Sequence, residues 1–213
     1  MTENPKHPGV LTETEDLQAV VREAVEEEQN ITGCHFKNSN LENTDAEMIE
    51  FHNCVFENCR FIQCSFHGIY FEDVTFLNCD LSNTDFTESF FRRARFENCK
   101  EMGANFAETT FDHVGMKDCN CRLANLSASK IKNAAFDHVD FTGGSFQQCG
   151  LKTVGFQQCS LIQAEFLHTP LKGIDFTRSE IGGILLSGEE LRGAIVTPVQ
   201  ACDLSRFLGL IVR

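Results

Sequence analysis

The sequence predicts an all-β solenoid with a short helix at each end, and three observations support this fold class. From Ile31 to Val196 every fifth residue is apolar, with Glu101 as the single exception among 34 positions. Eighteen of the 20 Phe fall on this register. No insertion breaks the step of five, so the pattern describes one continuous structure rather than a series of separate elements.

A second register, two residues before the first, indicates the local geometry. Small or β-branched residues such as Cys34, Thr44 and Ile69 occupy it, and only Gln29 and Glu189 depart from the rule. A period of five fits neither the helix, with about 3.6 residues per turn, nor the strand, which alternates. Two inward side chains separated by two residues indicate a short extended segment followed by a turn. Such repeats bury their inner face only against their neighbours, as in a solenoid.

The repeat unit resembles the pentapeptide-repeat pattern, small–Asp/Asn–Leu/Phe–x–x. The residues that carry the resemblance include Ala-Asn-Phe at 104–106, Ala-Asn-Leu at 124–126 and Ile-Asp-Phe at 174–176. The resemblance extends over about four-fifths of the chain. It implies a right-handed quadrilateral pentapeptide-repeat β-helix, in which four pentapeptides make one coil.

Residues 1–29 are expected to form a flexible tail plus an N-terminal capping helix. Residues 1–11 contain Pro and Gly and little apolar content, which is typical of a mobile tail. Thr-Glu-Thr-Glu at 12–15 matches a capping box, and apolar residues from Leu17 to Val25 then follow helical spacing. In one interpretation the helix covers the open edge of the first coil, and in the other it docks a partner.

Residues 30–198 are expected to form the β-helix, and Glu101 is its one irregularity. A carboxylate in an inward register would be costly to bury without a partner. We therefore expect a local bulge that turns Glu101 outward and lets Met102 take its place. Gly103, the following residue, would ease the distortion.

The C-terminal segment 199–213 leaves the register of five. Pro198 precedes apolar residues at helical spacing and Gly209 follows them, which predicts a short helix. Its apolar stripe is too rich for a solvated terminus. The segment therefore caps the last coil, pairs with another chain, or does both.

The chain has eleven Cys, and nine of them share the small inward position. In a coil of four pentapeptides, Cys59, Cys79, Cys99 and Cys119 would stack in one column about 4.8 Å apart. That spacing would permit a disulfide, but burial and a reducing compartment favour free thiols that fill the core. The sequence contains no C-x-x-C motif, so a zinc site is not predicted.

Charge and motifs narrow the classes of function. The chain carries 31 Asp+Glu against 18 Lys+Arg, a net charge of −13. Such a surface argues against binding nucleic acid or an anionic membrane and favours a basic partner. The sequence has neither a long apolar run nor a signal-peptide pattern, so a cytoplasmic location is expected. It also has no nucleophile, metal or nucleotide motif, so we expect neither an enzyme nor a cofactor.

The outward residues sort by charge when they are assigned to the four faces of the coil. The face centred on residues 46, 66, 86, 106, 126, 146, 166 and 186, here called the acidic face, has no Lys or Arg. Its carboxylates are the candidate partner-binding residues: Asp45, Glu47, Asp85, Glu88, Glu108 and Glu165. The next face, here called the basic face, carries Arg92, Arg93, Lys130, Lys132, Lys152, Lys172 and Arg192. The alternative is a solvated surface on which this sorting is partly accidental.

Two segments resemble the Qnr, or quinolone-resistance, branch of the pentapeptide-repeat family. Cys99 to Phe106 is similar to its C-x-x-x-G-A-x-F segment, and Gln200-Ala201 with Leu208 to Val212 is similar to its Q-A…L-G-I-x-V ending. The resemblance implies a homodimer joined through the C-terminus, with these candidate interface residues: Ala201, Leu204, Phe207, Leu208, Leu210 and Val212. It also implies a DNA mimic that binds DNA gyrase or topoisomerase IV and protects it from quinolones.

The unbroken count leaves no room for the loops that project from the coils of many Qnr proteins, so the chain resembles the loopless members. Two other functions stay open at this point. One is an immunity factor against a natural topoisomerase poison. The other is a structural or adaptor β-helix with no topoisomerase partner.

Overall fold

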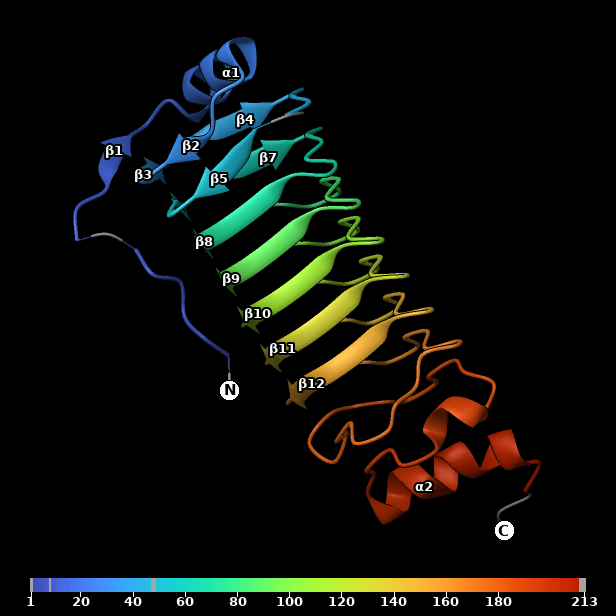
Figure 1. Cartoon of the computed structure of the whole chain (residues 1–213). Coiled ribbons are helices and arrows are strands. Elements are labelled where there is room, and N and C mark those ends of the chain that lie inside the picture. The colour runs from blue at the N-terminus through green and yellow to red at the C-terminus, as the bar shows by residue number, and fades with distance from the viewer. Residues whose placement is uncertain (1, 8, 47–48, 211–213) are drawn as a thin grey trace.

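The computed structural model describes residues 2–7, 9–46 and 49–210. It shows an elongated β-solenoid with a helix at each end (Figure 1), so the predicted all-β solenoid with short terminal helices is confirmed. The boundaries that we expect at 29/30 and 198/199 stay predictions.

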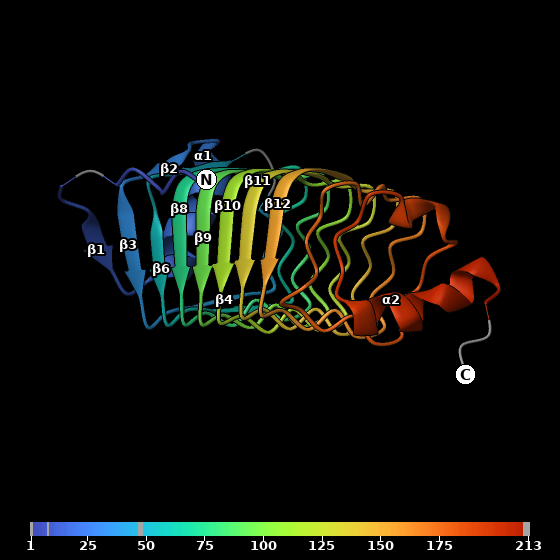
Figure 2. The same ribbon diagram turned by 90° about the horizontal axis from the view of Figure 1, so that it is seen from below.

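Short strands form most of the first three coils, and five longer strands follow. The short ones are β1 (Thr12–Thr14), β2 (Ile31–Thr32), β3 (Cys34–Lys37), β4 (Asn40–Glu42), β5 (Glu50–His52), β6 (Val55–Glu57) and β7 (Arg60–Ile62). The longer ones are β8 (Tyr70–Leu77), β9 (Phe90–Glu97), β10 (Thr110–Lys117), β11 (Lys130–Asp137) and β12 (Gly150–Gln157). The main sheet runs β1-β3-β6-β8-β9-β10-β11-β12, with β2 and β5 beside it, and β4 pairs with β7. Figure 2 shows the strands side by side along the rod.

Parallel pairing advances by one coil at a time. Phe51 lies opposite Phe71, and Phe71 opposite Phe91. Isolated bridges repeat the same step of 20 residues on the other faces, from Asp45↔Ser65 to Asp175↔Ile195. Each coil therefore contains four pentapeptides.

Left-handed residues turn the corners between pentapeptides. Asn38, Asn58 and Asn78 have φ of 50°, 54° and 53°, a conformation that Asn tolerates better than most residues. Their side chains also stack: Asn58 Nδ2 donates to Asn38 Oδ1 at 3.0 Å, and Asn78 Nδ2 to Asn58 Oδ1 at 3.2 Å. The repeated Asn thus fixes both the turn and the alignment of successive coils.

The inward register fills the core with columns of stacked rings. Phe71 and Phe91 lie 4.7 Å apart at 3°, and neighbouring columns meet edge to face, as Phe86 and Phe91 do at 5.6 Å and 67°. Both arrangements are favourable for aromatic pairs. Two coils have no ring at their four central positions: one in the middle of the rod, with Met116, Cys121, Leu126 and Ile131, and the last one, with Ile181, Leu186, Leu191 and Val196.

Glu101 keeps its place in the inward register, so the expected bulge is wrong. Its side chain is 0% exposed, whereas Met102 is 44% exposed. The preceding residue, Lys100, retains its parallel bridges to Asp80 and Asn120. The ladder therefore holds the backbone in register, and the carboxyl avoids burying a charge by staying protonated. Burial raises the pKa of Glu101 well above its usual value.

Helix α1 (Leu17–Glu27) packs on the first coil, with Leu17, Val21 and Ala24 buried against the core. Its N-cap is Asp16, which accepts a hydrogen bond from the backbone N–H of Ala19 at 2.9 Å. The capping box expected at 12–15 is wrong, because residues 12–14 form β1 and pair with β3. The pairing of β1 with β3 therefore prevailed over the capping-box pattern at 12–15.

Helix α2 (Pro198–Leu204) lies at the other end, between the 3₁₀ turns η1 (Glu189–Leu191) and η2 (Ser205–Leu208). It begins with a capping box between Thr197 and Gln200. The Gln200 side chain also donates to the carbonyls of Phe176 and Ser179, both at 2.9 Å. These bonds satisfy acceptors that the last coil would otherwise leave open.

Candidate functional site

The acidic face is built on a continuous ladder of parallel bridges. These link Asp45 to Ser65, Ser65 to Asp85, and Asp85 to Asn105, and they continue along the same face to Leu185. Each residue of this column precedes an inward Phe, Leu or Ala, so its side chain points outward. The repeat therefore holds the acidic side chains on a rigid, nearly straight surface.

The structure places five of the six predicted carboxylates on this face. Asp45, Glu88 and Glu108 are exposed, and Asp85 and Glu165 are half-buried. Glu47 lies outside the described residues. Within the described ranges, no Lys or Arg lies within 4.0 Å of these carboxylates, and the imidazole of His67 lies 3.9 Å from Glu88. The negative charge of the face is thus left largely uncompensated.

The two half-buried carboxylates have structural partners as well. Asp85 Oδ1 accepts hydrogen bonds from the backbone N–H and the hydroxyl of Thr87 and from Asn105 Nδ2. Glu165 accepts one from Gln147. Asp85 therefore fixes the turn that follows it, while Asp45, Glu88 and Glu108 are free to meet a partner.

The basic face is less basic than its sequence indicates. Arg93 lies between Asp73, with its Nε 2.7 Å from Oδ1, and Glu72, with its Nη2 2.6 Å from Oε1. The hydrogen bonds that Arg93 donates to Asp73 outweigh burial and raise the pKa of Arg93 above its usual value. Lys132 likewise contacts Asp112 at 3.6 Å. Asp73 and Arg93 are one coil apart, and this spacing of 20 residues was the signal that sequence reasoning missed.

The C-terminal surface is apolar but only partly made of the predicted residues. Leu204 is buried and Phe207 half-buried within the chain, whereas Ala201 and Leu210 are exposed. Val212 lies outside the described residues, as does the side chain of Leu208. Leu185 and Ile195 are also exposed. Leu185 ends a column that otherwise holds Asp, Ser, Asn and Glu, and Ile195 follows Asp175 in its own column, so both apolar residues could have been noticed in the sequence.

Other kinds of site are not supported by the described part of the chain. In that part, no group of three or more His, Cys, Asp or Glu side chains is placed to hold a metal ion. No helix there is long and apolar enough to cross a membrane.

Comparison with known families and structures gave consistent results for the fold. A family model described as "Pentapeptide repeat region" matches residues 49–122, 69–140 and 89–166, which together exceed half of the chain. No curated protein matched the sequence.

Three solved structures illustrate the range of likeness. QnrB1, a plasmid-mediated fluoroquinolone resistance protein, is 22% identical with a TM-score of 0.56, over 95% of this chain and 99% of that one. HetL from the cyanobacterium Nostoc is 13% identical with a TM-score of 0.45, over 86% and 94%. A thylakoid-lumen protein from Arabidopsis thaliana is 21% identical with a TM-score of 0.27, over 63% and 72%. At these identities the likeness concerns the fold alone.

Proposed function

Since this chain belongs to the pentapeptide-repeat family, we propose that it acts as a rigid DNA mimic that binds a type II topoisomerase, DNA gyrase or topoisomerase IV, and protects it from quinolones. The observation that carries the proposal is the acidic face, where exposed carboxylates lie along a straight ladder without compensating Lys or Arg. Such a surface suits the basic groove in which a topoisomerase holds duplex DNA. The protein acts by binding rather than by catalysis.

The charge supports the proposal in sign and in magnitude. Duplex DNA carries about one charge per 1.7 Å of axis. A rod of about eight coils at about 4.8 Å per coil is close to 40 Å long, and two rods end to end match about 47 DNA charges. Two chains of net charge −13 carry −26, roughly half of that number. Binding would therefore be steered electrostatically and weaken as salt rises.

An end-to-end homodimer would supply the length. Its proposed contact is the apolar C-terminal surface, on which Val199, Leu210 and Ile195 are 73%, 58% and 47% exposed. Exposed apolar side chains gathered at one end of a molecule favour association. A two-fold axis at this end would place the two acidic faces on one continuous rod.

A supercoiling assay with purified gyrase, with and without ciprofloxacin, tests the proposal. The informative variant reverses three exposed carboxylates of the acidic face, Asp45→Lys, Glu88→Lys and Glu108→Lys. Asp85 is left unchanged because its substitution would break the turn at Thr87. We expect this variant to need at least about tenfold more protein for the same inhibition, since three favourable charge contacts become repulsive.

The matched control reverses three exposed carboxylates outside the acidic face, Glu42→Lys, Asp118→Lys and Glu180→Lys. It changes the net charge by the same amount and should inhibit almost as well as the unmodified protein. Equal loss in both variants would mean that net charge, and not this face, is recognised. If the unmodified protein does not inhibit supercoiling, topoisomerase binding is refuted. If it inhibits supercoiling but does not reduce the effect of ciprofloxacin on gyrase, protection is refuted.

A further inference from the structure

The N-terminal segment 2–7, which sequence analysis expected to be flexible, lies along one corner of the solenoid and is here called the strap. Its backbone donates two hydrogen bonds to the coils: Lys6 N–H to Asp73 Oδ1 at 2.8 Å and Glu3 N–H to His113 Nδ1 at 3.0 Å. Two side chains add contacts: His7 Nε2 lies 2.8 Å from Thr75 Oγ1, and Asn4 Oδ1 accepts a hydrogen bond from Arg95 Nη2. The strap thus crosses β8, β9 and β10.

Two columns of outward residues form the groove in which the strap lies. One column holds the corner residues Asp73, Arg93, His113, Asn133 and Thr153, all with φ between 50° and 60°. The other holds Thr75, Arg95, Gly115, Ala135 and Gly155. The side chains of the second column become smaller toward the C-terminal coils, so the groove widens beyond the end of the strap.

The register of the strap matches the rise of the coils. Lys6 and Glu3 are three residues apart, which spans about 10 Å in an extended chain. Their acceptors, Asp73 and His113, are two coils apart, which is about 9.6 Å at the usual strand spacing. The two donating amides of the strap, three residues apart, therefore match corner residues that are two coils apart. The next acceptor in this series is the hydroxyl of Thr153.

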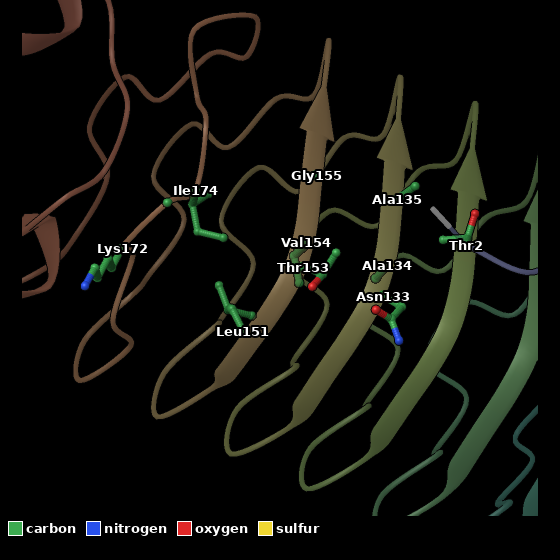
Figure 3. A pocket seen from close by; sticks show the side chains of 11 residues that line it. Thr2, Asn133, Ala134, Ala135, Leu151, Thr153, Val154, Gly155, Lys172 and Ile174 are labelled. Atoms are coloured by element: carbon green, nitrogen blue, oxygen red, sulfur yellow. The ribbon is translucent and has the colours of Figure 1, made fainter.

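The groove is open where that next amide would lie. A cavity of about 350 Å³ continues from the strap, with Thr2 at one end and Lys172 at the other, and Asn133, Ala135, Thr153 and Gly155 between them (Figure 3). Thr153 is exposed, and its φ of 56° is unusual for a β-branched residue. The other corner residues of this column share this left-handed conformation.

We propose that this corner groove is a binding site for an extended peptide segment of a partner protein, and that the strap is its intramolecular occupant. The segment has the chemistry of the strap: a backbone N–H opposite each acceptor of the corner column and an amide side chain opposite Arg95. It enters at the open cavity and displaces the strap coil by coil. This is main-chain recognition along a repeating surface.

The buried ion pair beneath the strap sets what the occupant must supply. Asp73 and Arg93 are only 6% and 8% exposed, and the Lys6 amide completes the hydrogen bonds of Asp73. An occupant without a backbone N–H at this point would leave the carboxylate short of a donor, which is unfavourable for a buried charge. A segment with Pro at this position is excluded for the same reason.

The groove lies at the corner between the basic face, which carries Asp73, and the face that carries Thr75, and the latter is opposite to the acidic face. The Thr75 column belongs to the pentapeptides centred on Phe76, and the acidic face belongs to those centred on Phe86, two of the four pentapeptides further along. A partner on the acidic face therefore leaves the groove accessible. The protein can join two partners at once.

Fluorescence anisotropy on the full-length chain tests the proposal, with the labelled peptide Thr-Glu-Asn-Pro-Lys-His as the probe. The variant Glu3→Pro/Lys6→Pro removes the two strap donors without changing the groove. The matched control Glu3→Ala/Lys6→Ala keeps both donors. We expect the proline variant to bind the probe at least about tenfold more tightly than the control, because an intramolecular occupant competes at high effective concentration. Equal affinities would overturn the proposal.

A second probe tests the register. Three alanines added to the N-terminus of the peptide supply the amide that would reach Thr153. We expect this longer probe to bind the proline variant about fivefold more tightly than the short one, the effect of one hydrogen bond. Thr153→Val should remove that gain and leave the affinity for the short probe unchanged. A gain that survives Thr153→Val, or no gain at all, would contradict binding along the open groove.

Discussion

Replacing Glu101 with leucine should stabilise the folded protein at neutral pH and have a much smaller effect near pH 4. Glu101 lies in the inward column between Leu81 and Cys121. Its Oε2 is 3.5 Å from Cys121 Sγ, and its Oε1 has no hydrogen-bond partner. Burial, followed by the nearby Cys119, raises the pKa of this carboxyl well above its usual value. The folded protein therefore holds a proton here that the unfolded chain releases.

The size of the effect follows from the pH and the ordinary pKa of glutamate. The unfolded chain releases the proton near pH 4.5. While the carboxyl stays protonated in the folded state, the free energy of unfolding falls by about 1.36 kcal/mol per pH unit above this value, which is on the order of 3 kcal/mol by pH 7. Below pH 4.5 both states are protonated and the penalty vanishes. The stability contributed by this group is thus greatest in acid and is lost as pH rises.

Urea unfolding at several pH values between 4 and 8 measures this penalty. Glu101→Leu should raise the free energy of unfolding at pH 7 by about 3 kcal/mol, and its advantage should shrink steadily toward pH 4.5. Glu101→Gln is the matched control, because it cannot ionise but keeps a polar side chain. Its free energy of unfolding, relative to that of the unmodified protein, should change with pH in the same way as that of the leucine variant. A pH-independent difference, or a leucine variant less stable than the unmodified protein at pH 7, would refute the assignment of a buried neutral carboxyl.

Three further predictions follow from the core and the C-terminal end. Burial opposes ionisation of Glu190, but the backbone N–H groups of His168 and Gly188 and the hydroxyl of Ser187 lower its pKa to about 2. Glu190→Gln should therefore lower the free energy of unfolding by about 3 kcal/mol at pH 7 and by little at pH 2, as urea unfolding at both pH values would reveal. Phe106→Ala should lower the free energy of unfolding by about 3–5 kcal/mol, and an unchanged melting temperature would contradict the stacked core. Val199→Asp with Leu210→Asp should yield monomers, whereas light scattering of the unmodified protein should report twice the 23.9 kDa chain mass; a monomer there would remove the proposed dimer.

The solenoid could be predicted from sequence because its cause is local. Each pentapeptide chooses its own inward residues and its own turn, so the register from Ile31 to Val196 is visible without any long-range information. The outward position of the acidic residues follows from the same count. Whether a partner recognises them depends on a second molecule, about which the period of five carries no information.

The features that sequence analysis missed depend on contacts between distant residues. The strap meets Asp73 and His113 across 67 and 110 residues, and no periodicity links them. For Glu101, a local rule favoured an outward side chain. The parallel ladder on both sides and the possibility of protonation reversed that preference. The pairing of Arg93 with Asp73 was accessible in principle, since the two residues share a column.

The ring-free coil in the middle of the rod divides it into two blocks. Rings stack before this coil, as Phe91 and Phe111 do, and again after it, as Phe146 and Phe166 do. Between them, the central positions are Met116, Cys121, Leu126 and Ile131, which make aliphatic and thiol contacts. In a linear array, cooperativity depends on the weakest interface between neighbouring repeats. Under a stretching force or in moderate denaturant, this coil should therefore unfold first. The resulting intermediate would keep the ring-stacked blocks on both sides of it folded.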